Sequence, residues 1–541
     1  MHRCLEIQEV VRIIVENLQH DPPHYLPALP PTSLLDWVSL ARTARTCRGF
    51  SDLALDILWR DQSSLLHLLK CLPSHTWEMV NLTPAPFPIK KMRFRAPIRT
   101  LDWDRVLFYS RRVRTFKYTS GLSLEDVELL AISLPVATLF PRLRTLKWGP
   151  TQPALFPYIR MFLSPTLKSI DLRLPPDSSR LSVLSYVSSK LPSLTAVNIH
   201  RPREESTPRF TQQLTEEATT LVLALKHVQE ITIPAVLPAA YERLASLSRL
   251  KHLTVGNLEG CLPPNAATSD SPSFRSLARL TVVGSTIQLG KNLLRWCDQT
   301  PLEHFCFYCT LPATGAEVSD LFTTLGNGFL HRHRLTSIDI QLSFNDDLGT
   351  NATAYEMSSI VLRPLLVFTN LSYLDLLTPL NVSFDDDFVD AMSIAWPKIK
   401  VLRFRNFTAD SRRGSITLSA LRAFALRCPR LEELELEFDA TTVPQGPHPV
   451  PHTPRVRQTR LVLLAVGDSP IEAPALVAHY LSAMFPGLQS IEANRAHGLT
   501  DDEEEEMRQA GRSTYHNWME VKKFVPLLAA ARSEEETSWT A

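Results

Sequence analysis

The chain has little of several features that would each mark a class of protein. Glycine is scarce, with 17 glycines against 41 prolines in 541 residues, which favours short, stiff connections over flexible linkers. The formal net charge is only +1, so we expect no surface that binds nucleic acid or anionic lipid throughout. No run of eighteen apolar residues occurs, and the first residues carry Arg3, Glu6, Glu9, Arg12 and Glu16. We therefore expect neither a secretory signal nor a membrane-spanning helix, and no membrane partner.

Cysteine is also too sparse and scattered to form a disulfide framework, since only 8 occur along the whole chain. The expected compartment is reducing, either the cytoplasm or the nucleus. Cys306 and Cys309 form a lone C-x-x-C. A zinc site needs four converging ligands, and the two cysteines lie on a predicted strand, where side chains three apart face opposite ways. We expect no metal site.

The short motifs that accompany catalysis are missing as well. The chain contains no G-x-G-x-x-G, G-x-x-x-x-G-K-[ST], G-x-S-x-G or H-E-x-x-H. We predict no catalytic residue, no cofactor and no enzymatic activity. An enzyme with an unrecognised site would need titratable side chains that converge on one face of the fold, which remains an alternative.

Short amphipathic helices are predicted at the N-terminus. In residues 5–18 the apolar side chains recur at the three-and-four spacing of one helix face. Prolines within 22–31 must break this helix, and 34–61 then predict two or three further short helices. About sixty residues of short helices give a thin core, so such a module gains stability by docking onto something else.

From residue 111 onwards, one motif returns throughout the chain. It consists of an aliphatic residue, two polar residues, an aliphatic residue, a polar residue and an apolar residue, and twelve steps between positions 113 and 488 have a mean of about 31 residues. The leading aliphatic residues are Val113, Leu143, Leu167, Leu194, Val228, Leu250, Leu277, Leu302, Leu335, Leu371, Ile399, Leu431 and Leu488. The last step is the longest and predicts a degenerate unit around 460–464. This spacing is typical of a leucine-rich repeat.

The repeat has a physical explanation that predicts the fold class. The alternating centre of each motif is a short strand with one apolar face, and the leading aliphatic residue enters the same core from the preceding turn. Each unit exposes an apolar edge until a neighbour covers it. We therefore predict an α/β protein: a small all-helical N-terminal domain, then an irregular leucine-rich-repeat solenoid with parallel strands on the concave face and helices outside.

The predicted boundaries are 1–60 for the helical domain, 61–110 for a connecting segment, 111–499 for the solenoid, and 500–541 for a C-terminal helix with an acidic start and a tail. Thr500 and Glu503 fit a capping box, and Trp518, Val521 and Phe524–Val525 predict an apolar face that covers the last repeat. The proline-rich stretch 442–454 is predicted to be a disordered loop.

Residues 5–60 resemble an F-box of the kind found in fungal F-box/leucine-rich-repeat proteins. The matching positions are Glu9, Val10, Val11, Ile14, Val15, Leu18, Leu34, Leu35, Cys47, Arg48, Phe50, Leu58 and Trp59. The sequence departs from the family at Glu6-Ile7, where Leu-Pro is usual, and at Phe50, where Trp is commoner.

The resemblance implies a substrate receptor of an SCF-type ubiquitin ligase, which docks on a Skp-family adaptor and through it on a cullin–RING complex. The repeats would then hold a target protein whose identity the sequence does not give. The positions implied for adaptor contact are Val10, Val11, Ile14, Leu18, Leu35, Cys47, Phe50, Leu58 and Trp59. Such positions could equally form the thin core of the module. An adaptor-independent interaction scaffold built on the same repeats is the alternative.

Residues 90–117 contain ten basic residues against Asp102 and Asp104. The residues proposed for an electrostatic patch are Lys90, Lys91, Arg93, Arg95, Arg111, Arg112 and Arg114. Such a patch would bind an acidic or phosphorylated target. The competing interpretation is a solvated face of the first repeats, which is what charge runs more often are. Nucleic acid is not an expected partner, because no interleaved aromatic motif accompanies the charges.

Overall fold

The chain folds into two compact units, Met1–Pro234 and Ala235–Ala541, which are described separately. The computed structural model describes residues 7–17, 37–81, 90–118, 122–202, 207–256, 274–328, 330–343, 356–378, 381–383, 385–406, 416–444, 456–494 and 514–540. Leu18 and Leu35, the capping box at Thr500 and most of the stretch 442–454 lie outside these ranges.

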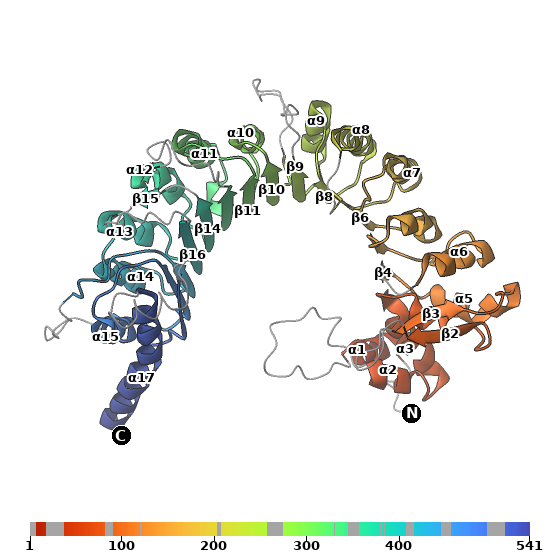
Figure 1. Ribbon diagram of the computed structural model, residues 1–541, viewed down its shortest axis with the longest axis horizontal. Helices are drawn as coiled ribbons and strands as arrows, with labels where there is room; N and C mark the ends of the chain where they lie inside the picture. Colours follow the sequence, from red (N-terminus) through yellow and green to blue (C-terminus); the bar gives the residue numbers. More distant parts are fainter. Residues whose placement is uncertain are drawn as a thin grey trace. The chain divides into compact units, whose positions relative to one another are not determined.

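Among its described residues, the first unit begins with three short helices, α1 (Gln8–Glu16), α2 (Trp37–Thr43) and α3 (Arg48–Arg60) (Figure 1). Helix α1 falls within the segment 5–18, for which the sequence predicts a helix. Helix α3 ends at Arg60, and the chain enters the sheet at once through β1 (Asp61–Gln62). The first strand of the sheet therefore lies inside 61–110, the segment assigned above to a connection.

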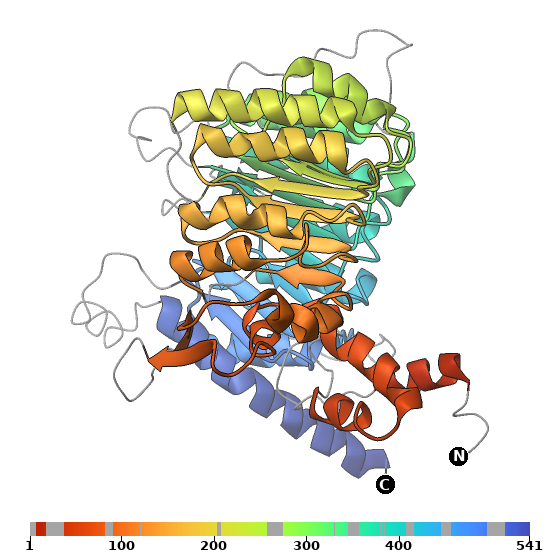
Figure 2. The same ribbon diagram turned by 90° about the vertical axis from the view of Figure 1, so that its right-hand side faces the viewer.

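The strands of the first unit form one parallel sheet in chain order, β1-β4-β5-β6-β7-β8. The strands after β1 are β4 (Thr115–Lys117), β5 (Thr145–Trp148), β6 (Ser169–Arg173), β7 (Ala196–His200) and β8 (Glu230–Ile233). Between β1 and β4 lie α4 (Leu66–Leu69), the antiparallel pair β2 (Trp77–Asn81) and β3 (Lys90–Phe94), η3 (Thr100–Trp103) and α5 (Asp104–Ser110). The later crossovers contain α6 (Leu124–Ser133), η4 (Pro153–Phe162), η5 (Ser178–Leu181), α7 (Ser182–Lys190) and α8 (Pro208–Ala224). Figure 2 shows these later helices stacked side by side over the sheet.

The strands of the second unit are also parallel and in chain order. They are β9 (His252–Gly256), β10 (Arg279–Gly284), β11 (His304–Cys309), β12 (Ser337–Leu342), β14 (Tyr373–Thr378), β16 (Val401–Asn406), β17 (Glu433–Glu435), β18 (Leu463–Gly467) and β19 (Ser490–Ala493). The helices are α9 (Pro238–Ser246), α10 (Ile287–Arg295), α11 (Gly315–Asn327), η6 (Arg332–Arg334), α12 (Ser359–Leu362), η8 (Arg363–Val367), α13 (Asp386–Ala395), η9 (Leu418–Ala420), α14 (Leu421–Arg427), α15 (Pro474–Met484) and α17 (Thr514–Thr540). A separate two-stranded pair joins β13 (Glu356–Ser358) to β15 (Asn381–Ser383). Within this unit the strands line the inner side and helices α10 to α14 the outer side (Figure 1).

Burial confirms the repeat that the sequence predicts. Every leading aliphatic residue of the thirteen motifs is between 0% and 3% exposed. The first apolar strand residue of a motif lies in register with those of neighbouring coils, as Leu374 does between Ile338 and Leu402. The predicted degenerate unit also exists, because Arg460 and Leu461 lead into β18. The α/β architecture and the parallel strands of the predicted solenoid are thus present.

A second regular feature runs along one edge of each sheet. Before β4 to β8, and before β10 to β12, β14 and β16 to β19, the residue that precedes the strand donates its backbone N–H to the carbonyl oxygen of the equivalent residue in the preceding coil. Arg144 donates to Arg114 at 2.7 Å and Lys168 to Arg144 at 2.8 Å in the first unit. Lys400 donates to Ser372 at 2.8 Å in the second. We call these positions the edge row; they hold successive coils in register at the amino ends of the strands.

The C-terminal helix α17 covers the last repeat, packing on α15 and β19. Trp518 is fully buried, and its indole Nε1 donates to the Ser469 carbonyl oxygen at 2.8 Å. Val521 and Val525 are buried beside it, whereas Phe524 remains 41% exposed. The predicted apolar face therefore contains Val525 of the pair Phe524–Val525.

Trp518→Ala should uncap the last coils, because it removes a buried ring and leaves the Ser469 carbonyl without its donor. The expected loss is about 3–5 kcal/mol of local stability, read as faster amide hydrogen exchange across residues 456–494. Phe524→Ala on the same helix is the matched control and should change exchange little. Equal effects of the two substitutions would mean that the helix does not cover the repeat through Trp518.

Candidate binding surfaces

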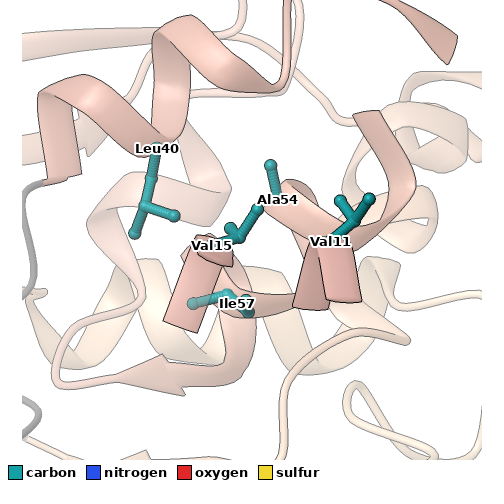
Figure 3. Close-up of a cluster of buried hydrophobic side chains, with 5 residues drawn as sticks. All are labelled: Val11, Val15, Leu40, Ala54 and Ile57. Carbon is teal, nitrogen blue, oxygen red and sulfur yellow. The ribbon is translucent and has the colours of Figure 1, made fainter. Parts of the chain in front are cut away.

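The N-terminal helices enclose a small apolar core (Figure 3). Its members are Val11 and Val15 from α1, Leu40 from α2, and Ala54 and Ile57 from α3. Val11, one of the positions implied for adaptor contact, therefore lies in the core. Five aliphatic side chains bury little area, so a module of this size gains stability from further contacts.

Some of the remaining positions implied for adaptor contact pack inside the module, and others lie on its surface. Phe50 and Leu58 are half-buried and pack against the core, while Cys47 is the half-buried N-cap residue of α3. Trp59 is half-buried and stacks on Tyr109, with ring centroids 4.6 Å apart and planes at 21°. These side chains hold the module together and attach it to α5.

Helix α1 carries more apolar surface than its core uses. Ile7, Ile13 and Ile14 are exposed, Ile14 to 47%, and Val10 is half-buried among them. At about 100° per residue, the apolar arc of α1 spans roughly 200°, twice what a core-facing helix needs. We call Ile7, Val10, Ile13 and Ile14 the apolar stripe; it is the kind of surface that a partner helix or groove covers.

Helix α2 adds to the exposed apolar area of the module. Trp37 is 40% exposed and Val38 is 58% exposed. A surface tryptophan is a common anchor in protein–protein interfaces. In the described part of the chain, the helical module thus presents exposed apolar side chains on two of its three helices.

A buried arginine ties the module to the repeats. Arg112 follows α5 and is only 8% exposed. Its Nη2 donates to Asp52 Oδ1 at 2.6 Å, its Nη1 donates to the Asp52 carbonyl oxygen at 3.3 Å, and it pairs with Asp56. Burial works against the cation, but the hydrogen bonds to both carboxylates outweigh it and raise the pKa of Arg112. Its guanidinium also lies over the Phe108 ring. Arg112 therefore links α3 to the first coil through these contacts, which we call the Arg112 strut.

The other basic residues of 90–117 do not form one continuous surface with Arg112. Arg93 and Arg95 are exposed on or just after β3, and Lys91 is half-buried there. Lys90 opens β3, and its side chain lies outside the described part. Arg111 is exposed over the Phe108 ring, and Arg114 lies on the edge row. The sequence cluster thus splits between the hairpin and the turn before β4.

Arg114 takes part in a basic groove that the sequence analysis missed. The groove has a volume of about 810 Å³ and opens at the amino ends of the strands of the first unit. The residues lining it include Arg114, Arg142, Arg144, Thr166, Lys168 and Ser193. The signal was in the motif, since Arg114, Arg144 and Lys168 each stand one residue after the leading aliphatic. They become neighbours only when the motifs are stacked in register.

Polar side chains on the strand face of the second unit bind one another. The Asp375 carboxylate is 2% exposed and accepts from Arg405 Nε at 3.1 Å and from the Tyr373 hydroxyl at 3.2 Å. Arg403 pairs with both Asp375 and Glu433. Burial and the neighbouring Asp375 charge raise the pKa of Tyr373. The arrangement is a cross-strand ion-pair network that ties β14, β16 and β17 together.

The cysteine pair on β11 has the geometry that its spacing predicts. Cys306 is half-buried on the strand face, and Cys309 is buried on the opposite face. Burial raises the pKa of both thiols. Across the ranges that the structure describes, no three His, Cys, Asp or Glu side chains are placed to hold a metal ion. No helix in those ranges is both long and apolar enough to cross a membrane.

Comparisons with known proteins add little. No family model and no curated protein matches the chain. Among solved structures, the yeast complex of Rad7 and Elc1 overlaps with 92% of this chain and 90% of the matched chain, at 12% identity and a TM-score of 0.30. A similarity of that size carries no argument about partners or activity.

Arg112→Met should weaken the joint between the module and the first coil. Asp52 and Asp56 are half or more exposed and can be solvated, so we expect a loss of about 1–2 kcal/mol. The measurement is the urea unfolding midpoint, together with hydrogen exchange at the amides of α3. The neighbouring exposed Arg111→Met should cost less than about 0.5 kcal/mol. If both variants shifted the midpoint alike, the strut role of Arg112 would be wrong.

Proposed function

We propose that the chain is the target-binding receptor of an SCF-type ubiquitin ligase. Its N-terminal helices would dock on a Skp-family adaptor and thereby on a cullin–RING complex, while the repeats hold a target protein. The observation that carries this proposal is the apolar stripe of α1, which is exposed next to a module core of only five buried side chains. The resemblance of residues 5–60 to an F-box indicates the class of partner that would cover the stripe, a Skp-family adaptor.

The apolar stripe fits a docking role in its position as well as its composition. Val11 and Val15 point into the core, so Ile14 and Ile7 on the adjoining face can be covered without unfolding the module. Covering the exposed part of a large aliphatic side chain contributes on the order of 1 kcal/mol each. Trp37 and Val38 would extend the contact to α2.

The connection between module and repeats also fits this function. A receptor that performs no chemistry acts by holding a target at a defined place, which raises the effective concentration of its lysines. That requires a stiff link between the docking surface and the holding surface. Here β1 follows α3 directly and pairs with β4, Trp59 stacks on Tyr109, and Arg112 pairs with Asp52 and Asp56. We propose a non-catalytic role in the cytoplasm or nucleus.

The rigid link affects how the proposal is tested. Deleting residues 1–60 would remove the module, but it would also strip Arg112 of both carboxylates and expose the end of the sheet. A point substitution on the apolar stripe separates adaptor binding from folding.

Ile14→Glu should abolish or strongly weaken adaptor binding, because it places a charge in the middle of the covered surface. We expect at least a thirtyfold rise in Kd, equivalent to about 2 kcal/mol for an interface hot spot. The measurement is calorimetry or interferometry with a purified Skp-family adaptor. Ile132→Glu on α6 is the control, since Ile132 is 86% exposed and distant from α1 in sequence.

Two results would contradict the proposal. The first is no binding of the wild-type chain to the adaptor, which would favour an adaptor-independent scaffold on the same repeats. The second is equal binding by Ile14→Glu and wild type while the module remains folded. Thermal unfolding of both variants should match the wild type, because neither side chain is buried.

A further inference from the structure

The basic groove of the first unit arises from the edge row. In the first unit a chain of backbone hydrogen bonds joins the edge-row residues of successive coils, from Arg60 to Gln229. Successive edge-row residues lie about 4.8 Å apart, the spacing of adjacent strands. In the first unit they are Arg60, Arg114, Arg144 and Lys168, followed by the neutral Thr195 and Gln229. Four consecutive coils therefore direct basic side chains from one edge of the sheet.

The charges of Arg114, Arg144 and Lys168 are not neutralised by a carboxylate within the described part of the chain. Arg60 has carboxylate partners, Asp61 at 3.1 Å and Glu16 at 3.8 Å. Arg114 donates only to backbone carbonyl oxygens, those of Arg111 at 3.4 Å and Arg142 at 3.3 Å.

Lys168 likewise donates to the Ser193 carbonyl oxygen at 3.5 Å. Arg142 and Arg144 are exposed, and no ion pair between described residues involves either of them.

The neutral side chains of the groove are engaged with the backbone. Thr166 Oγ1 donates to the Leu143 carbonyl oxygen at 2.7 Å, and Ser193 Oγ donates to that of Leu167 at 3.0 Å. Beyond the groove, at the next edge-row position, Thr195 Oγ1 donates to the Lys168 carbonyl oxygen at 3.0 Å. The cationic ends of Arg142, Arg144 and Lys168 are thus the groups that an anion in the groove would meet, Lys168 having only a carbonyl oxygen as its partner.

The pKa of Arg114 also reflects the cations that surround it. Burial lowers its pKa, and the neighbouring cations Arg142 and Arg144 lower it further, against a weaker opposing effect of Asp56. Like charges that destabilise one another in the free protein are stabilised when an anion joins them. Ordinary solvated faces mix both signs of charge, which this groove does not.

We propose that this groove binds a phosphorylated serine or threonine segment of the target protein. The inference rests on the proposed function, because it names the chemical class of the target. Arg142 and Arg144 offer two planar forks that match phosphate oxygens in bidentate fashion, and Lys168 adds a third donor. Arg114, Arg144 and Lys168 span two steps of the edge row, roughly 10 Å, about the length of three extended residues.

A nucleic acid fits the groove less well. Single-stranded nucleic acid is usually held by aromatic side chains on which bases stack, as well as by a charged track. The lining of this groove consists of Arg, Lys, Pro, Thr and Ser without an aromatic ring. The basic run also ends after four coils, at Thr195, so the track is short.

The test is a binding titration on the full-length chain. The probe is a fluorescein-labelled peptide mixture with one fixed phosphoserine and random flanking residues, compared with its unphosphorylated twin. We expect at least tenfold tighter binding of the phosphorylated mixture, and competition by millimolar inorganic phosphate. Arg144→Glu should lose at least tenfold, and Arg144→Lys should lose less because it keeps the charge without the fork.

Lys400→Glu is the matched control. Lys400 occupies the same edge-row position before β16, but its neighbours in the row are Ser372 and Glu432. This variant should bind the phosphorylated mixture as the wild type does. Thermal unfolding should be unchanged in all these variants, since their side chains are exposed.

Several outcomes would overturn the proposal. Equal binding of the two mixtures would do so, as would equal losses from Arg144→Glu and Lys400→Glu. Tighter binding of a twelve-residue oligothymidylate that Arg144→Glu abolishes would make the groove a nucleic-acid site instead. Ile14→Glu should retain phosphopeptide binding and lose the adaptor, so failure of the ligase role and failure of the groove give different results.

Discussion

The structure depends on one constraint: a coil of the repeat is stable only when a neighbouring coil covers it. The leading aliphatic residue and the strand aliphatics of each motif are buried between coils, and the edge row supplies the backbone hydrogen bonds that join one coil to the next. Exposed ends of such a stack are costly, and the chain covers them with helices. In the second unit α17 covers β19, with Trp518 at the contact. In the first unit α3 leads directly into β1, so the N-terminal module occupies the first end of the sheet.

The repeat itself could be predicted because it depends on local alternation of apolar and polar residues, repeated many times. The degenerate unit shows where this fails. Before β18 the side chain of the buried Gln458 bonds to the backbone of its own coil and the preceding one. Its amide nitrogen donates to the carbonyl oxygens of Leu431 at 2.6 Å and Cys428 at 3.3 Å, and its amide oxygen accepts from the Leu461 N–H at 2.8 Å. A buried glutamine with this role has no signature in the sequence. The position of β18 was predictable, but the reason for its stability was not.

The candidate sites were harder to predict, because each depends on which neighbour a residue meets. The apolar arc of α1 is too wide to show from sequence whether Val11 or Ile14 faces the core; only the packing against Leu40 and Ala54 decides it. Arg112 and Arg114 are two residues apart and look equivalent in a basic run. One is buried against Asp52 and Asp56, some sixty residues earlier, and the other faces Arg144 across the edge row. Pairings of that kind follow from tertiary register.

The same tertiary register links the two proposed binding roles. The strut of Arg112 and the groove residue Arg114 flank Val113, which is fully buried as the leading aliphatic of the first predicted motif. A displacement of α3 that moved Asp52 and Asp56 would therefore act on the turn that positions Arg114. The proposed docking surface on α1 and the proposed anion groove at the amino ends of β4 to β7 are thus linked by one short piece of backbone. In the proposed receptor role that stiffness matters, because the position of a bound segment relative to the adaptor would determine which lysines come within reach.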